Sequence, residues 1–423
     1  MQVKTLILGA GLTGLSAAYH LEQAGETDYL LVEKEAAPGG LCASVQKNGF
    51  TYDYGGHLLH LHTPYGKKLV KKLLQNNCAR LHRNAWIYTA SSRVPYPFQA
   101  HLSALPAKQR AQCVAGFNNR PAFKNIRTFE QWCLAQFGRG VYEQFFKPYN
   151  TKLWGLSPSR LTAQWCGPFV PVLSAKELRQ SLQKRPRKTY GYNSSFYYPQ
   201  KGGIGALAQA LADKISRLQL RSPVTAVDLT RKIAVVKGKE IHYKHLINTL
   251  PLDRFIGLLK NQKILKKQAK KLKSASVTLL HLAVARPVEP FSWIYFPEKT
   301  VPFYRVGLQS GFSPTNAPKG TSLFYIELPG LQKPSAALKK KIWNSLLQKG
   351  IINRSDRAVF SAWQHIPAAY AVYDKNREKT VEALRTRLRR QGCRCAGRYG
   401  RWEYTFMESA LLEGKDVASQ VKK

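Results

Sequence analysis

The order of apolar and polar residues predicts alternating strands and helices at the start of the chain. An apolar run at residues 3–8 leads into glycines, an amphipathic stretch and a second apolar run that ends at Glu33. Such an order is typical of a buried strand, a tight turn, a helix and a second strand. Residues 222–251 then alternate, which predicts a small antiparallel sheet that returns to a parallel strand.

The middle and the end of the chain show other patterns. Residues 63–180 are mostly helical in pattern and carry irregularly spaced aromatic residues. Residues 275–330 are rich in strand formers and contain WIYFPEKTVPFYRVGL, which suits a sheet that floors a pocket. Residues 335–352 and 376–390 predict basic helices, and residues 396–420 predict a strand, a turn and a helix.

Length and composition favour a large globular protein. The 423 residues are enough for two or three domains or for one interleaved architecture, and 44% of them are hydrophobic. There is no run of 18 apolar residues, and the seven cysteines are irregularly spaced. Because residues 1–9 lead straight into a predicted strand, we expect no signal peptide. We therefore expect free thiols and a cytoplasmic location.

The charge of the chain is strongly positive and widens the range of partners. There are 66 Lys and Arg residues against 24 Asp and Glu, which gives a net charge of +42. Nucleic acid, an anionic membrane surface and phosphorylated small molecules all remain open as partners. Basic runs such as LKKQAKKLKS (265–274) are most often solvated helix faces, so charge alone does not choose among them.

The glycines after the first strand form the pattern Gly9-x-Gly11-x-x-Gly14, and Glu33 follows 19 positions later. Glycines with this spacing allow the backbone to approach a pyrophosphate at a helix N-terminus. The acid accepts a hydrogen bond from a ribose hydroxyl. Because strand, turn, helix, second strand and acid are in register, the segment predicts dinucleotide binding.

A second pair of glycines favours FAD over NAD. Gly39 and Gly40 follow Glu33 closely and continue the approach of backbone to phosphate. This extension is typical of two-domain FAD-binding proteins, whereas NAD dehydrogenases usually lack it. Near the C-terminus, Gly397 and Arg398 suggest a second approach to the same cofactor.

Residues 53–62 read DYGGHLLHLH and raise the question of a metal site. No carboxylates or thiolates stand at ligand spacing beside His57, His60 and His62. On a strand, His60 and His62 would face one side and His57 the other. We therefore expect no bound metal at this stretch.

Six further motifs follow one another along nearly the whole chain. They are VPYPFQ (94–99), FFKPYNTKLWGL (145–156), GYNSSFYYP (191–199), WIYFP (293–297), PFYR (302–305) and GRYGRWEY (397–404). Together they resemble the UDP-galactopyranose mutases, in particular the eukaryotic-type branch, which are FAD-dependent flavoproteins related to the amine oxidases. A generic flavin oxidase would share only the two glycine regions and the C-terminal strand and helix.

The resemblance implies a flavoenzyme without net redox chemistry. In that family reduced FAD attacks the anomeric carbon of UDP-galactopyranose through N5 and displaces UDP. The sugar ring opens and recloses as the furanose, and UDP then returns. For this chain the resemblance implies an isomerase of a UDP-sugar in cell-envelope polysaccharide biosynthesis, with NADPH or NADH as the reductant.

The resemblance also implies site residues. The implied catalytic residues are His57 beside the flavin, Arg305 at the diphosphate and Asn193 at the sugar. The implied cofactor-binding residues are Gly9, Gly11, Thr13, Gly14, Glu33, Gly39, Gly40, Leu41, Gly55, Gly56, His57, Val224, Gly397, Arg398, Tyr404 and Met407. The implied substrate-binding residues are Tyr96, Gln99, Phe145, Asn150 and Trp154 for uridine, with Asn193, Trp293, Tyr295, Arg305, Tyr370 and Tyr404 for the diphosphate and the sugar.

Three positions depart from the family's pattern. Phe169 stands where the family has its second phosphate-binding arginine, so phosphate binding should weaken unless Lys147, Lys201 or another base compensates. His60 replaces an aromatic residue, and no asparagine occurs near Glu408. These departures leave open an altered nucleotide-sugar or a related reaction on another substrate.

The patterns and the resemblance together predict an α/β protein. A Rossmann-type FAD-binding domain is expected to be interleaved with a helical domain and an antiparallel β-sheet substrate domain. The expected ranges are 1–62, 200–255 and 390–423 for the first, 63–190 for the mainly helical, uridine-binding part, and 256–389 for the antiparallel sheet with its flanking helices.

Two alternatives to a mutase stay open. One is a net-redox FAD-dependent oxidoreductase, like an amine oxidase or a desaturase, in cell-envelope glycan or lipid biosynthesis. Its basic surface could rest on an anionic membrane, and an oligomer is also open. The other is a nucleic-acid-binding protein, which charge alone suggests. No recognised nucleic-acid-binding module occurs, so we do not expect specific binding of nucleic acid.

Overall fold

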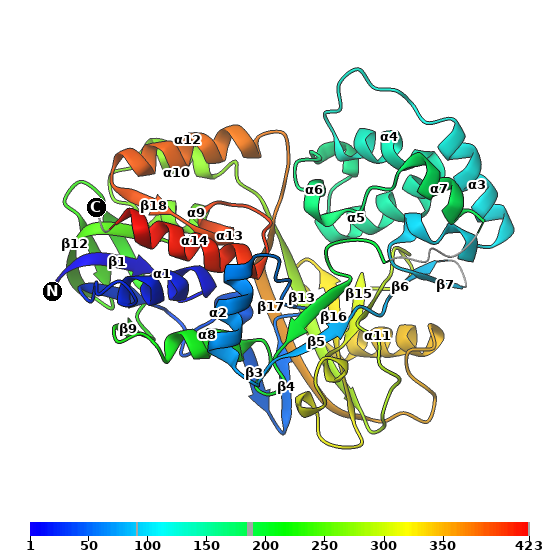
Figure 1. The fold of residues 1–423 in the computed structure, drawn as a ribbon, viewed down its shortest axis with the longest axis horizontal. Helices are drawn as coiled ribbons and strands as arrows, with labels where there is room; N and C mark the ends of the chain where they lie inside the picture. Colours follow the sequence, from blue (N-terminus) through cyan, green and yellow to red (C-terminus); the bar gives the residue numbers. More distant parts are fainter. Residues whose placement is uncertain (90–91, 184–188, 422–423) are drawn as a thin grey trace.

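The structure, a computed structural model, describes residues 1–89, 92–183 and 189–421. Figure 1 shows two lobes, and both chain termini lie in the lobe built around the first sheet. The other lobe combines a second sheet with a group of helices. The predicted α/β class is confirmed. Within the described residues, no helix is both long and apolar enough to cross a bilayer.

Seven strands form the first sheet, which carries the glycine motif. Strands β12, β1, β2 and β9 are parallel, β10, β11 and β12 form an antiparallel meander, and β18 joins the end of β12. Both predictions for this region are confirmed: the strand, turn, helix and second strand, and the meander that returns to a parallel strand. The strands are β1 (Gln2–Leu8), β2 (Tyr29–Val32), β9 (Leu218–Gln219), β10 (Val224–Asp228), β11 (Ile233–Val236), β12 (Lys239–Asn248) and β18 (Cys393–Cys395).

Helices cover both faces of this sheet, so its central strands are apolar on both sides. On β1, Ile7 packs with one group of helices and Leu6 and Leu8 pack with the other, because successive side chains of a strand point to opposite faces. The first group is α1 (Leu12–Glu22), α2 (Pro64–Leu74), α8 (Gly205–Ala212) and α14 (Met407–Gln420). The second group is α9 (Leu252–Leu258), α10 (Lys263–Ala269) and α12 (Arg377–Arg390).

The second group of helices corrects the expected content of residues 256–389. Helices α10 and α12 fall in that range, but their buried Leu265 and Leu384 pack on the first sheet rather than on the antiparallel one. Each helix has one apolar face, and the nearest uncovered apolar surface for that face is the side of β1 that carries Leu6 and Leu8. We keep the division into three domains as a proposal, with this change.

The second sheet also has seven strands, in the order β17, β13, β16, β15, β14, β6 and β7. Neighbours are antiparallel except β14 and β6, which are parallel. Residues 85–89 and 92–95, expected in a mainly helical stretch, instead form one edge of this sheet, because alternate residues of 85–89 are buried. The strands are β6 (Ala85–Thr89), β7 (Ser92–Pro95), β13 (Ser274–Val284), β14 (Trp293–Tyr295), β15 (Arg305–Leu308), β16 (Ser322–Pro329) and β17 (Ala358–Ala371).

The remaining elements complete the two lobes. Helices α3 to α7 pack around an aromatic core that includes Phe129, Phe137 and Phe146. The two predicted basic helices correspond to α11 and α12. The elements are α3 (Ala107–Asn118), α4 (Phe129–Val141), α5 (Lys147–Trp154), α6 (Cys166–Phe169), α7 (Ala175–Ser181), α11 (Ala336–Gln348), α13 (Gly397–Gly400), and the strand pairs β3 (Ser44–Lys47) with β4 (Phe50–Asp53) and β5 (Ala79–His82) with β8 (Ser195–Tyr198).

Candidate active site

The turn after β1 closes tightly because Gly9 and Gly14 have no side chains. Gly9 has φ +96°, and a Cβ on Gly14 would lie 1.9 Å from the carbonyl oxygen of Gly9. At Gly11 a Cβ would meet nothing within 4 Å, so the turn is open on the side where a ligand would approach. A Cβ on Gly397 would lie 2.5 Å from Thr13 Oγ1, which places α13 directly against the start of α1.

Glu33 lies at the carboxyl end of β2 and faces the glycine turn. Its carboxylate accepts hydrogen bonds from the backbone N–H of Ala10 at 2.8 Å and of Glu35 at 3.0 Å. Gly39, with φ +118°, donates its N–H to the carbonyl of Ala10 at 2.8 Å. The Glu33 carbonyl accepts from the N–H of Ser222, just before β10 and Val224. The predicted cofactor residues of these segments therefore converge at one end of the first sheet.

A buried carboxyl group anchors the loop that carries His57. Asp53, at the end of β4, accepts hydrogen bonds from Ser44 Oγ, Tyr198 OH, Gln309 Nε2 and the N–H of Ile204, at 2.5 to 3.1 Å. Burial raises the pKa of Asp53. These four partners fix the end of β4 and so fix where the Gly55–Gly56 turn begins.

The Gly55–Gly56 turn lies directly on strand β16. A Cβ on Gly55 would come within 2.9 Å of Glu327 Oε1, and a Cβ on Gly56 within 2.5 Å of the Tyr325 hydroxyl. Burial, together with the positive charges of Arg398 and Arg305, lowers the pKa of His57 to about 3. His57 is therefore neutral at physiological pH, and its buried Nδ1 has no hydrogen-bond partner within the described residues.

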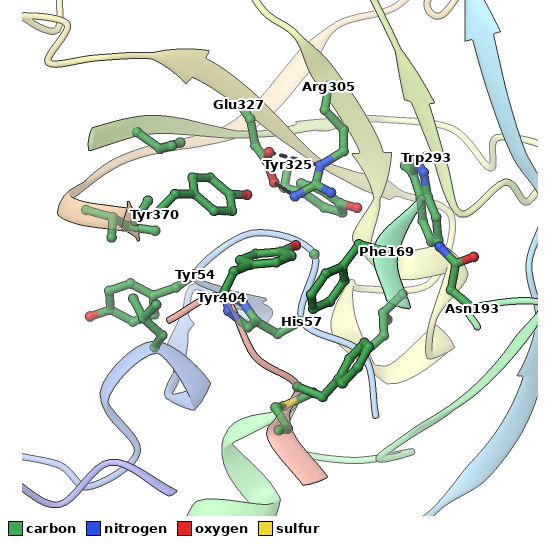
Figure 2. A pocket seen from close by; sticks show the side chains of 18 of the residues that line it. Tyr54, His57, Phe169, Asn193, Trp293, Arg305, Tyr325, Glu327, Tyr370 and Tyr404 are labelled. Carbon is green, nitrogen blue, oxygen red and sulfur yellow. Dashed lines mark hydrogen bonds and ion pairs between the residues drawn. The ribbon is translucent and has the colours of Figure 1, made fainter. Parts of the chain in front are cut away.

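A cavity of about 160 Å³, partly open to solvent, lies between this turn and the second sheet. Eleven of the predicted residues line it: Leu41, Gly56, His57, Asn193, Trp293, Tyr295, Arg305, Tyr370, Arg398, Tyr404 and Met407. Figure 2 shows Tyr404 beside His57, with Arg305 and Glu327 joined at one wall and Trp293 next to Asn193 at another. The structure thus brings the predicted catalytic residues to one cavity.

Arg305 and Glu327 form a paired charge in the cavity wall. The Arg305 Nε and Nη2 groups donate to the two carboxylate oxygens of Glu327 at 2.9 and 2.6 Å. Burial alone would lower the pKa of Arg305, but the Glu327 carboxylate raises that pKa well above its ordinary value. Arg305 is therefore a permanent cation in the cavity.

Tyrosine hydroxyl groups surround this pair. Burial raises the pKa values of Tyr295, Tyr325 and Tyr370, so each keeps its proton at physiological pH. The buried Tyr325 hydroxyl has no partner within the described residues. Neutral hydroxyl donors around a guanidinium suit an anionic oxygen of a ligand.

Phe169 does line the cavity, at the position where the family's second arginine is expected. Its ring lies 4.3 Å from the ring of Tyr404 and 4.7 Å from that of Phe406, between centroids. Tyr192 closes the cluster at 5.6 Å from Phe169 and 4.8 Å from Phe406. An aromatic wall therefore replaces a charged one here.

The proposed compensating lysines do not reach the cavity. Lys147 is exposed and paired with Glu143 at 2.9 Å, and Lys201 is exposed beside Asn77. Neither lines the cavity, whose permanent cations are Arg305 and Arg398 within the described residues. Neither lysine is therefore positioned to compensate for the missing arginine, because both point to solvent.

The histidine stretch is not a continuous strand. Within residues 57–62 only Leu59 forms a bridge, with Tyr197, and His57 and His60 both line the cavity whereas His62 does not. The predicted alternation of the three histidines was therefore wrong. Within the described residues, no group of three or more His, Cys, Asp and Glu side chains could hold a metal ion.

The five predicted uridine residues lie behind the cavity rather than in its wall. Tyr295 contacts both Tyr96 and Phe145, with ring centroids 5.4 and 6.4 Å apart. The amide of Gln99 donates to the carbonyl of Pro171 at 2.6 Å, and the amide of Asn150 donates to Phe146 at 2.8 Å and accepts from Trp154 at 3.2 Å. These residues form a second group that adjoins the cavity through Tyr295.

Two functional candidates were missed from the sequence. Glu327 is an acid inside the apolar strand SLFYIELP, and that contrast was the available signal. Arg83 donates to Asn193 Oδ1 and to the carbonyl of Tyr190, and its guanidinium carbon lies 4.8 Å from the centre of the Tyr96 ring. Nothing in the sequence around Arg83 indicates this contact, since its partners are far away along the chain.

The residues present fit an FAD. The open side of the turn at Gly11 would admit the pyrophosphate, and Glu33 lies next to it for the ribose. At the other end, the Nδ1 of His57 and the Nε of Arg398, which have no partner among the residues that the structure describes, flank the cavity that a flavin ring would enter. Unpartnered buried polar atoms are costly, so a ligand that satisfies them is expected there.

Comparison with known proteins agrees with this fit. The sequence profile of the family described as flavin containing amine oxidoreductase matches residues 12–422. A protein described as a "probable UDP-galactopyranose mutase" from Klebsiella pneumoniae is 21% identical over 261 residues, which cover 59% of this chain and 61% of that protein. The chloroplastic prolycopene isomerase of Arabidopsis thaliana is 25% identical over 336 residues, 67% of this chain and 54% of that protein. The matches thus span little more than half of these relatives.

Solved structures extend the likeness to the whole chain. A crystal structure of reduced UDP-galactopyranose mutase has a TM-score of 0.95 at 28% identity and covers 100% of this chain and 94% of that one. A putrescine oxidase bound to putrescine has a TM-score of 0.66 at 13% identity, which shows a shared fold alone. The chain therefore belongs to the flavin-containing amine oxidoreductase family, within which it is a mutase-like flavoprotein.

Proposed function

We propose that this flavoenzyme interconverts the pyranose and furanose forms of a UDP-sugar without net oxidation. The observation that carries the proposal is the cavity in which Arg305 lies among the hydroxyl groups of Tyr295, Tyr370 and Tyr404, next to His57. A cation and several hydroxyl donors suit a diphosphate that leaves and returns. An amine or an apolar lipid offers no anionic oxygen to bind them.

In this proposal the glycine turn and Glu33 hold FAD at one end, and the His57 loop adjoins its flavin at the other. When bound and reduced, FAD supplies a nucleophilic nitrogen for the anomeric carbon of the sugar. Neutral His57 can donate or accept one hydrogen bond at that place. Gly55 and Gly56 give the loop room to approach and to shift as the redox state changes.

Residues of the cavity and of the adjoining uridine group orient the substrate in this proposal. We propose that Asn193 and Trp293, which line the cavity, hold the sugar, and that Arg305 with Tyr370 stabilises the charge of the departing UDP. We propose that Tyr96, Gln99, Phe145, Asn150 and Trp154 bind the uridine. For this, the amides of Gln99 and Asn150 must share or exchange their bonds to Pro171 and Phe146.

The aromatic wall around Phe169 favours one alternative, a net-redox oxidoreductase that acts on an amine or a lipid. With Arg398 assigned to the cofactor, Arg305 is left as the one arginine for the diphosphate, and one arginine binds a diphosphate less firmly than two. The alternative fits less well because the paired Arg305 and Glu327 stand in the same cavity. An apolar substrate would leave this charged pair without a polar ligand.

Several further features remain proposals. We propose NADPH or NADH as the reductant, a cytoplasmic location and a role in building cell-envelope polysaccharide. An oligomer and contact with an anionic membrane are proposed as well, the latter supported by the net charge of +42. No specific nucleic-acid target is proposed.

The test uses purified protein reduced with dithionite in the absence of oxygen. UDP is titrated against the flavin absorbance, UDP-galactopyranose is then added, and the products are separated by chromatography. We expect UDP to bind and a UDP-galactofuranose peak to appear with the reduced protein only. The variant Arg305→Gln is expected to keep its flavin and lose UDP binding. Failure of the reduced protein both to bind UDP and to form furanose would overturn the proposal.

A further inference from the structure

A strongly basic face lies on the lobe of the first sheet, built by α10 and α12. The two helices run antiparallel and are tied at both ends. Gln262 donates to Gln391 at 2.9 Å at one end, and Lys273 pairs with Asp374 at 3.3 Å at the other. Figure 1 shows the pair along the outer side of this lobe. None of the residues of α10 lines the cavity of the candidate site.

The segment around α10 carries charge of one sign only. From Arg254 to Lys273 the sequence has eight basic residues and no Asp or Glu, and all eight are exposed. The apolar side chains Leu265 and Ala269 face inward and fix the helix on the sheet. The lysines therefore point outward together. The basic run at residues 265–274, which sequence alone would assign to a solvated helix face, forms part of one continuous patch.

Helix α12 turns its two acids toward α14, together with Arg385 and Arg389. Glu378 and Glu382 line a groove that faces α14. Arg387 is exposed and lies nine residues after Glu378, which at 3.6 residues per turn puts it on the opposite flank. Glu378 is thus turned away from the flank that carries Arg387, and Arg387 extends the patch. We use the name basic face for residues 263–271, which include α10, together with the flank of α12 that carries Arg387.

An exposed apolar side chain stands within the basic face. Ile264 is 62% exposed, between Lys263 and Lys266. It is one of six large hydrophobic residues that are exposed in the described part of the chain, and it alone belongs to the basic face. A lysine-rich surface with a protruding aliphatic side chain suits the boundary between lipid headgroups and acyl chains.

We propose that the basic face docks on the anionic surface of a lipid bilayer, with Ile264 entering the headgroup region. Nucleic acid fits less well, because single strands are bound through aromatic stacking and the only aromatic residue from Arg254 to Lys273 is the buried Phe255. Lysine side chains act as point charges toward phosphates and give no bidentate recognition. The inference does not rest on the proposed chemistry, since the face lies outside the catalytic cavity.

Vesicle sedimentation tests the proposal on the flavin-loaded full chain. Vesicles rich in phosphatidylglycerol are compared with vesicles of phosphatidylcholine alone. The face variant is Lys263→Gln, Lys266→Gln, Lys267→Gln and Lys270→Gln together. The control removes four exposed charges from the other lobe: Lys319→Gln, Lys333→Gln, Lys340→Gln and Lys341→Gln. We expect the affinity of the face variant for anionic vesicles to fall by about tenfold or more. The affinity of the control variant should change by less than about twofold.

Two further measurements keep the test decisive. Raising the salt concentration should release the wild-type protein, and Ile264→Ser should weaken binding even if the fourfold variant fails to fold. Equal losses in the face and control variants would overturn the proposal, because net charge alone would then explain binding. Binding of duplex DNA that depends on the four lysines, with no binding of anionic vesicles, would overturn it in favour of nucleic acid.

Discussion

Arg305 and Glu327 stand directly opposite each other on strands β15 and β16 and share two hydrogen bonds, of 2.9 and 2.6 Å. Glu327 also lies against the Gly55 turn, where a Cβ would come within 2.9 Å of its carboxylate. The one pair therefore connects the cation proposed for the diphosphate with the loop that carries His57. A substitution of Glu327 should therefore affect both Arg305 and the His57 loop.

Replacing Glu327 by Gln should lower both stability and turnover. The change leaves the buried guanidinium of Arg305 without a counter-charge, which costs on the order of 3 kcal/mol in free energy of unfolding. Denaturant unfolding measures this loss. In the control, Glu298→Gln, the broken pair with Lys349 lies outside the cavity. That variant should keep full affinity for UDP, and an equal loss of UDP affinity in both variants would contradict the special place of Glu327.

Replacing Phe169 by Arg should strengthen the binding of UDP. The ring lies in the cavity wall 4.3 Å from Tyr404, so a guanidinium there would face the ligand together with Arg305. We expect affinity for UDP to rise about tenfold at low salt and to fall with added salt. Phe169→Leu serves as the uncharged control. Unchanged or weaker UDP binding in the arginine variant would show that the diphosphate lies elsewhere.

Replacing Arg83 by Met should lower the efficiency of turnover without releasing the flavin. Arg83 donates to Asn193 Oδ1, so it turns the amide nitrogen of Asn193 away from itself. Without this hold we expect kcat/KM for the UDP-sugar to fall about tenfold, with partial rescue by Arg83→Lys. The matched control is Arg80→Met, whose exposed side chain bonds Ser195 at 3.2 Å. Equal effects of both methionine variants would remove Arg83 from the site.

Stability should fall on acidification because histidines are buried in the neutral form. Burial lowers the pKa of His281 from 6.5 to about 4 beside Tyr52 and Gln364. Below pH 6.5 the unfolded chain binds a proton that the folded chain refuses until about pH 4, so stability is lost across this window and is constant for this group above it. In His281→Leu, the decrease in free energy of unfolding between pH 6.5 and pH 4 should be smaller by on the order of 3 kcal/mol. Urea unfolding from pH 7 to pH 4 measures it, and an unchanged slope would contradict the assignment.

The nucleotide-binding part of the fold follows from local sequence. Gly9, Gly14 and Glu33 lie within one short stretch, and each has a steric or hydrogen-bonding duty that only its residue type fulfils. Their arrangement depends on neighbours along the chain, so the pattern alone was sufficient. Residues 85–89 read AWIYT and favour a strand, but they were missed because the surrounding stretch 63–180 is mostly helical in pattern.

The polar contacts of the site could be predicted only in part. Arg305 was found through its motif, but its partner Glu327 lies 22 residues away, and the register of β15 with β16 decides that they meet. Arg83 and Asn193 are 110 residues apart, so no local pattern links them. The uridine residues were named by resemblance, which gives residue types and not the hydrogen bonds that Gln99 makes.

In the proposed reaction the flavin takes part without being consumed. The most direct measurement follows the flavin absorbance and the sugar products together, with the reduced protein, UDP-galactopyranose and no oxygen. We expect many equivalents of UDP-galactofuranose per flavin while the flavin stays reduced, with slower turnover but full flavin content in His57→Ala. Bleaching of the oxidised flavin by a substrate, with oxygen uptake and no furanose, would contradict it.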